Sequence, residues 1–260
     1  DAKTTGNNDV AIGYGALSTD VAGQNSVAVG YNALFAQNFT TATNTYNVAV
    51  GRSAGESIST GIHNTLVGAS AGDALTDADQ NVAVGYLALS TDTLGSKSTA
   101  LGQGTLKVQN FTTATDPYNT AVGYQAGTAV TTGTQNTILG GLAGDALTDA
   151  DFNVAVGTSA LSADTLGSRA VAIGRKALFT QNFTTATDNY NTAVGFSAGE
   201  AITTGVNNTL LGALCGDSMT TGANNVGVGV HAIGNATLTG SFNTAVGFNA
   251  GSSTTSGANN

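Results

Sequence analysis

The amino-acid sequence predicts an all-β protein, a repeat β-solenoid of about fourteen coils, and three observations carry this prediction. A Gly that follows a short apolar triplet recurs fourteen times between Gly13 and Gly247. The interval is seventeen in most units, as from Gly68 to Gly85, and twenty-one in every fourth unit, as from Gly102 to Gly123, so super-repeats of four units start near 30, 102 and 174. The composition agrees, with 36 Gly, 1 Pro and only 9% charged residues, whereas a typical soluble domain carries about 25% charged residues.

The length of the unit selects the kind of repeat. The common unit, such as the interval from Gly68 to Gly85, is shorter than a helix pair or a propeller blade, which need roughly 34 to 50 residues. It suits one coil of a parallel β-roll or β-helix, made of a strand such as NTAVG, a second short segment and a polar turn. We therefore expect residues 1–260 to form a single β-solenoid segment of a longer repeat array.

Two apolar columns flank the middle of each strand. The residue before each Gly is aliphatic in all fourteen units, and Val or Thr stands two residues earlier. Because side chains alternate across a strand, these two columns share one face. We expect this face to point into the coil, with the aliphatic column at Val29, Val50, Val67 and Val84 buried.

The opposite face of the strand is sterically small. Ala lies between the two apolar columns in ten units, and the Gly follows on the same face. We expect this small face, for example at Ala49, Gly51, Ala121 and Gly123, to lie outward and to admit a close partner.

An Asn column stands four residues before the Gly. It is present in ten units, at Asn47, Asn64, Asn81, Asn119, Asn136, Asn153, Asn191, Asn208, Asn225 and Asn243. In stacked coils such a column forms a ladder in which each side-chain amide bonds the next.

The charge pattern narrows the partners. The 7 Lys and Arg residues against 16 Asp and Glu residues give a net charge of -9, with no basic run. Nucleic acid binding needs clustered cations, so we expect no nucleic acid partner. No apolar stretch approaches the roughly 18 residues of a membrane span, so we expect no membrane insertion.

Groups for catalysis are sparse, and we expect neither an enzyme nor a cofactor. His63 and His231 lie in units far apart, and the GGLAG stretch (140–144) lacks the Lys of a phosphate loop. Cys215 stands where twelve other units have Ala, which favours a buried small side chain over a nucleophile.

Two acidic turns, GDALTDADQN (72–81) and GDALTDADFN (144–153), each carry three carboxylates. Hard oxygen ligands at this spacing are weak candidates for Ca²⁺. The favoured interpretation is a polar turn, because the third copy (216–225) keeps only Asp217. The six candidate ligands are Asp73, Asp77, Asp79, Asp145, Asp149 and Asp151.

The lengthened units share the loop QNFTTAT, which recurs at 37–43, 109–115 and 181–187. If these loops project, an aromatic ring flanked by Asn and Thr suits contact with a receptor such as a cell-surface glycan or protein. The alternative, which we favour, is that the Phe packs against a neighbouring coil or a trimer seam. The receptor-contact candidates are Asn38, Phe39, Asn110, Phe111, Asn182 and Phe183.

The units NSVAVGYNAL (25–34), NTAVGYQAG (119–127) and NTAVGFSAG (191–199) resemble the head repeats of YadA-like trimeric autotransporter adhesins. They are also similar to repeats of bacteriophage tail-fibre proteins. The resemblance implies a left-handed parallel β-roll, association as a homotrimer, an extracellular or virion-surface location and a role as a fibre segment in host or surface attachment.

Other functions compete with this one. A self-assembling extracellular filament subunit is an alternative. An ice-binding solenoid needs an unbroken array of Thr, and the Thr/Val column divides seven to seven in irregular order. A polysaccharide-degrading β-helix is disfavoured because clustered catalytic acids and bases are missing.

Overall fold

The structure is a computed structural model that describes residues 6–234, 239–253 and 255–257. It confirms an all-β repeat solenoid of about fourteen turns, with no helix among the described residues. The chain divides into two compact units, unit 1 (residues 1–132) and unit 2 (residues 133–260). Each unit is described by itself.

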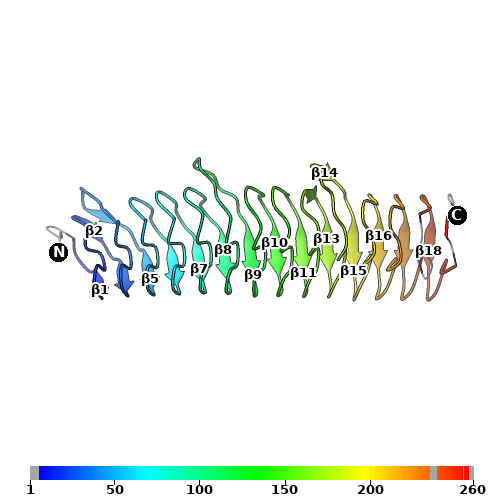
Figure 1. Ribbon diagram of the computed structural model, residues 1–260, viewed down its shortest axis with the longest axis horizontal. Coiled ribbons are helices and arrows are strands. Elements are labelled where there is room, and N and C mark those ends of the chain that lie inside the picture. Colours follow the sequence, from blue (N-terminus) through cyan, green and yellow to red (C-terminus); the bar gives the residue numbers. More distant parts are fainter. Residues whose placement is uncertain (1–5, 235–238, 254, 258–260) are drawn as a thin grey trace. The chain divides into compact units, whose positions relative to one another are not determined.

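Every coil contributes one three-residue strand to a parallel ladder (Figure 1). In unit 1 the seven strands are β1 (Val10–Ile12), β3 (Val27–Val29), β5 (Val48–Val50), β6 (Thr65–Val67), β7 (Val82–Val84), β8 (Thr99–Leu101) and β9 (Thr120–Val122). In unit 2 they are β10 (Thr137–Leu139), β11 (Val154–Val156), β13 (Val171–Ile173), β15 (Thr192–Val194), β16 (Thr209–Leu211), β17 (Val226–Val228) and β18 (Thr244–Val246).

The register of the ladders follows the repeat. Val82 pairs with Thr99 and Val84 with Leu101, so equivalent positions of successive coils lie side by side. Short second pairs occur where a lengthened coil follows a normal one: β2 (Gly23–Gln24) with β4 (Thr43–Asn44), and β12 (Gly167–Ser168) with β14 (Thr187–Asp188). A single bridge joins Gly95 to Thr115 at the equivalent place.

The two faces of the strand lie opposite to the expected sense. The middle residue is the buried one, and Ala28, Ala49, Leu66 and Ala83 are all fully buried. The prediction that Val29, Val50, Val67 and Val84 point inward is wrong, because these side chains are only half-buried. The prediction that the small Ala and Gly face lies outward is wrong for the same reason, since Ala49 and Ala121 are both buried.

Side-chain volume explains the inversion, because the coil interior is narrow. Where the middle residue is Leu66, the residue four after the Gly is Gly72, and a Cβ there would lie 2.8 Å from Leu66 Cδ2. Where the middle residue is Ala83, the corresponding position holds Leu89, which is fully buried. In each of these two coils one of the two positions holds a large side chain and the other a small one, so the packed volume stays the same, as close packing requires.

The Gly column is required by backbone conformation and by the closeness of the coils. Gly85 has φ +136°, a region that L side chains rarely adopt. A Cβ on Gly85 would lie 2.5 Å from the carbonyl oxygen of Gly102 in the next coil. The Gly that ends each strand is therefore the residue that lets the coils stack at strand spacing.

The Asn ladder is present. Asn64 N–H donates to Asn47 Oδ1, and Asn81 N–H donates to Asn64 Oδ1, both at 2.9 Å. Each Asn Nδ2 also donates to a turn carbonyl, as Asn64 does to Ala78 O at 2.7 Å. Unit 2 repeats the pattern, with Asn208 N–H donating to Asn191 Oδ1 at 2.9 Å. The main link is the backbone N–H of the next residue rather than its amide group.

Replacing Leu66 by Ala should lower the free energy of unfolding by about 2–5 kcal/mol, because a fully buried leucine leaves a cavity. The matched change in the same strand, Val67→Ala, removes a half-buried side chain and should cost at most about 1 kcal/mol. Urea unfolding followed by circular dichroism measures both. A greater loss for Val67→Ala than for Leu66→Ala would contradict the assignment of the faces.

Candidate interaction surface

The outward side of the strand ladder is the largest collection of exposed apolar side chains. We call it the sheet face, and it comprises the residues one, three and five before each strand-ending Gly and the residue one after it. Among the described residues, 18 of the 20 exposed large apolar side chains lie on it, the exceptions being Phe35 and Val108. All seven Tyr residues of the chain lie there as well.

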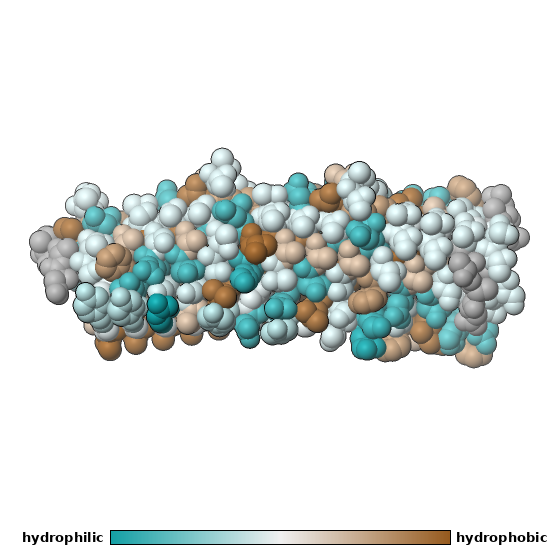
Figure 2. Space-filling model, viewed as in Figure 1, coloured by the Kyte–Doolittle hydropathy of each residue, from teal (hydrophilic) through white to brown (hydrophobic). Residues whose placement is uncertain are grey.

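The centre of the sheet face is mainly aliphatic, with Thr in half of the units of one column, and its two rims combine aromatic with polar and cationic side chains. Val82 and Val84 occupy the central columns of their coil, and Tyr86 on the rim is 54% exposed. Figure 2 shows a row of hydrophobic residues along the lower edge of unit 1, where the strand arrows of Figure 1 end. Apolar patches larger than a few hundred Å² are uncommon on monomers and mark interaction surfaces.

Charge is distributed unevenly between the sheet face and the remaining surface. None of the 16 acidic residues occupies a sheet-face column, although the chain has a net charge of -9. Two of the cations on this face are neutralised at its border, where Lys97 pairs with Asp116, and Arg169 Nε lies 3.0 Å from Asp188 Oδ2. The sheet face is therefore apolar and carries no unpaired anion.

The rim side chains stack on one another along the ladder. The rings of Tyr46 and His63 lie 5.5 Å apart with planes 10° from parallel. The Arg169 guanidinium lies 4.6 Å from the centroid of the Phe152 ring. In these two pairs one planar face of the ring is directed at a neighbouring coil.

The Phe side chains of the lengthened loops are packed into the fold. Phe39, Phe111 and Phe183 are buried, with exposed fractions of 9%, 6% and 7%. The packed arrangement of these rings, rather than a projecting one, is thus the arrangement found. Phe183 covers the preceding coil, since a Cβ on Gly167 would lie 2.8 Å from Phe183 Cδ2.

The other loop candidates lie nearer the solvent. Asn38 and Asn182 are exposed, and Asn110 is half-buried. Thr93 Oγ1 donates to Asn110 Oδ1 at 3.1 Å, which ties this Asn to the coil before it. The most exposed part of each loop is the Thr-Thr-Ala tip at residues 40–42, 112–114 and 184–186.

A buried carboxylate beneath each loop was not anticipated from the sequence. Asp92 is fully buried, and its Oδ1 accepts from Gly95 N–H and Phe111 N–H, both at 3.0 Å. Its Oδ2 accepts from Gln109 Nε2 at 2.6 Å. The same arrangement recurs at Asp20 with Gln37 and at Asp164 with Gln181.

These clusters continue the Asn ladder across a gap in it. The Asn column is interrupted at Ser26, Ser98 and Ala170. In the second case Gln109 Nε2 reaches Ser98 Oγ at 3.1 Å, and Gln109 Oε1 accepts from Asn119 Nδ2 at 2.9 Å. Gln109 stands seven residues after Gly102, as Asp92 stands seven after Gly85, so a Gln in the regular register of the coil reaches the place that Asn leaves. The recurring D-x-x-G at 20–23, 92–95 and 164–167 is the signal that could have located these clusters.

The buried carboxylate of Asp164 has a perturbed acidity. Burial raises the pKa of Asp164 above its usual 3.8, although the N–H groups of Phe183, Gln181 and Gly167 partly oppose this. No charged neighbour contributes to the shift. The protonated form is therefore favoured by folding.

The acidic turns do not assemble a metal site. Asp77 Oδ1 accepts from Thr60 Oγ1, and Asp79 Oδ1 accepts from Ile62 N–H, each at 2.7 Å. Asp151 Oδ1 accepts from Thr134 N–H at 2.6 Å, and Asp145 accepts from Ser162 Oγ. Across residues 6–234, 239–253 and 255–257, no three His, Cys, Asp or Glu side chains are grouped so as to hold a metal ion.

Two carboxylates of the acidic turns have a buried oxygen without a hydrogen-bond partner among the described residues, Asp73 Oδ1 and Asp217 Oδ1. Burial raises the pKa of both groups. Asp149 is exposed.

The remaining chemical groups are dispersed. His63 is exposed on the rim of the sheet face, whereas Cys215 is fully buried. Burial raises the pKa of the Cys215 thiol to about 11, which keeps it protonated and unreactive near neutral pH.

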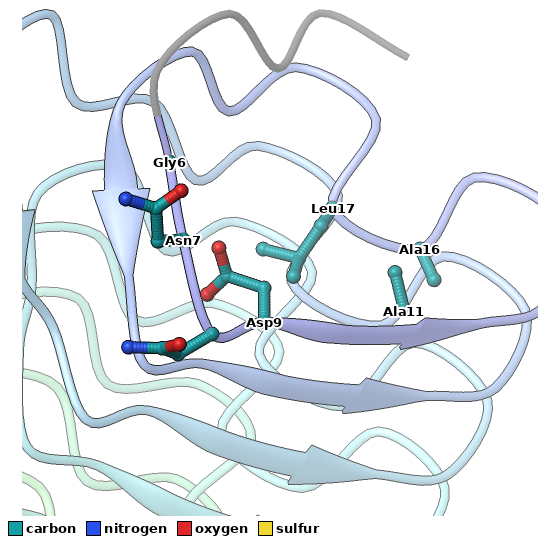
Figure 3. A pocket seen from close by; sticks show the side chains of 7 residues that line it. Gly6, Asn7, Asp9, Ala11, Ala16 and Leu17 are labelled. Atoms are coloured by element: carbon teal, nitrogen blue, oxygen red, sulfur yellow. The ribbon is translucent and has the colours of Figure 1, made fainter.

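A cavity of about 420 Å³ lies at the first coil of unit 1 (Figure 3). Its walls come from Ala11, Ala16 and Leu17, with the Asp9 carboxylate at its margin. Asp9 Oδ1 accepts from Ser26 N–H at 2.7 Å, so this carboxylate helps to connect the first two coils.

Comparisons with family models, curated proteins and solved structures find no match. The geometry defines the class of protein as a parallel β-solenoid. Within the described ranges, no helix has the length and apolar character to cross a membrane.

Gln109→Ala and Phe111→Ala should each destabilise the chain. The first removes the donor to Asp92 Oδ2 and the acceptor of Asn119 Nδ2, at about 1–3 kcal/mol for each buried hydrogen bond that is lost. The second removes a buried ring, at about 3–5 kcal/mol. The control Thr113→Ala changes an exposed residue of the same loop and should remain within about 0.5 kcal/mol. Melting temperatures of the three variants measure this, and an unchanged value for both Gln109→Ala and Phe111→Ala would contradict the anchoring role.

Asp164 should make the chain less stable as pH rises. Its folded pKa lies above the 3.8 of the unfolded chain, so its contribution is greatest at low pH and declines as pH rises from 3.8 through the raised pKa. The slope of unfolding free energy against pH should therefore be shallower in Asp164→Asn. The control is Asp149→Asn, in the exposed acidic turn. Equal slopes for wild type and Asp164→Asn would count against this assignment.

Proposed function

We propose that this chain is a structural segment of an extracellular or virion-surface attachment fibre, the shaft or receptor-binding region of a tail fibre or a trimeric adhesin. The observation that carries the proposal is that the buried polar side chains of both units are used in coil-to-coil hydrogen bonds. Asn64, Asn81 and Asn208 link successive coils in this way. A stack held by such ladders resists bending and local opening, which is what a shaft needs.

The state of the buried polar and thiol groups supports a structural role over catalysis. The buried Asp–Gln clusters satisfy one another, and the Cys215 thiol is protonated at neutral pH. The large apolar sheet face suits permanent association, which agrees with a homotrimer. In this proposal receptor contact belongs to the exposed Thr-Thr-Ala tips or to a region outside these residues.

The ice-binding alternative finds less support. Thr and Val alternate irregularly on the sheet face, as at Val48, Thr65 and Val82, and aromatic side chains border the aliphatic centre. Measured thermal hysteresis in the purified chain would favour this alternative, whereas its absence is expected.

Light scattering at micromolar concentration tests the assembly that the proposal needs. The expected mass is that of three chains of 25.5 kDa each. A mass of one chain at all concentrations would overturn the trimeric fibre.

Binding of the fluorescently labelled chain to a panel of glycans and bacterial surfaces tests the position of the receptor site. If the segment is a shaft whose receptor site lies outside these residues, no binding beyond background is expected. Binding that is lost when Thr112 and Thr113 are changed together to Asp would identify this segment as the receptor-binding region.

A further inference from the structure

We infer that the sheet face is the surface through which copies of this chain pack against one another, with the sheet faces of three copies directed at a common axis. This inference rests on the proposed function and names the partner of its assembly as a second copy of the same chain. It relocates the contact from the Ala column, which lies inside the coil, to the half-exposed Val and Thr columns on the other side of the strand.

The area available is sufficient for a stable interface. Seven strands at about 4.8 Å spacing give a length of roughly 34 Å, and the seven positions across the sheet face give a width of roughly 20 Å. Each unit therefore offers roughly 700 Å² and the two units of a chain roughly 1,400 Å². In a trimer this gives roughly 700 Å² for each of two partners, close to the roughly 800 Å² that each partner contributes to a stable interface of standard size.

The arrangement of residues matches that of an interface. Aliphatic side chains such as Val82 and Val84 form the centre, while Tyr86 and Tyr118 lie at the rims. Interface centres are depleted in charged residues, and aromatic residues are enriched at interfaces. In this chain acidic residues are absent from every sheet-face column.

Burying this face leaves few charges uncompensated. Lys97 and Arg169 already have carboxylate partners within the chain. Arg52 and Arg175 lie over the rings of Tyr31 and Phe196, at 5.9 and 5.6 Å from the centroids. A like-charged cluster of unpaired anions, which would repel a second copy, is not formed.

A second copy fits this face better than another ligand. Its strands have the same spacing, so its side-chain rows fit between those of the first copy in every coil, as in packed β-sheets. A sugar would find no hydrogen-bonding side chain in the column before each Gly, which is aliphatic in every unit.

The test changes two central positions of unit 1 together, Val50→Lys and Val84→Lys. Both side chains are half-exposed, so each coil should still form, but association would bury unpaired charges. The matched control places Lys outside the sheet face in the same two coils, as Ser57→Lys and Ser90→Lys, at positions that are also half-buried. Mass by light scattering and secondary structure by circular dichroism are measured for both.

The Val variant should fall from the mass of three chains to the mass of one while keeping its β-sheet spectrum, and the Ser control should remain trimeric. A trimeric Val variant would overturn the assignment of this face and leave the trimeric fibre standing. A single-chain wild type would overturn both, and if it bound a hydrophobic dye that the Val variant did not, the face would belong to a different protein partner.

A cross-linking measurement covers the case in which the Lys variant does not fold. Val84→Cys is a mild change, and the native Cys215 is fully buried and does not compete. A short bis-maleimide should link chains through Cys at 84 and leave Ser90→Cys chains unlinked. Linking of Ser90→Cys alone would place the contact outside the sheet face and overturn the inference.

Discussion

The fold depends on one constraint, that the interior of the stacked coils is narrow and is filled by side chains of the same and the neighbouring coils. An inward polar group must therefore find its partner in the coil before or after it. The Asn ladder meets this need, with Asn64 bonded to Asn47 and to the Ala78 carbonyl. The Gly column allows it, because only a residue without Cβ lets Gly85 approach Gly102 so closely.

The same constraint separates the two faces of the strand. Small Ala is placed inside, and a larger Leu or Ile enters only where a Gly elsewhere in the coil makes room, as Gly72 does for Leu66. Branched side chains are thereby placed outside, where they form a continuous apolar surface. A bare apolar surface of this kind is an aggregation hazard, which the proposed association of copies would remove.

Sequence reasoning located the repeats, the strands and the Asn ladder because each depends on spacing alone. It assigned the Val column to the interior because alternation defines two faces without saying which is inside. Side-chain volume decides which face is inside. The sequence carries a signal for this, because Leu66 with Gly72 in one coil becomes Ala83 with Leu89 in the next. The Asp92–Gln109 pair was missed although its members lie one repeat apart, because the position seven after the Gly holds Asp or Gln in some coils and an apolar residue in others.

The Asp–Gln clusters also bear on how such a chain can change its length during evolution. Each cluster repairs the ladder within a block of four coils, so every such block, as from Gly30 to Gly102, presents equivalent neighbours at both of its boundaries. Unequal recombination between two such blocks in the gene adds or removes a whole block without creating a new junction. Loss of the coil that carries Asp92, or gain of a coil directly after it, instead places Gln109 beside a coil that lacks its Asp partner, and selection against that mismatch keeps these two coils together.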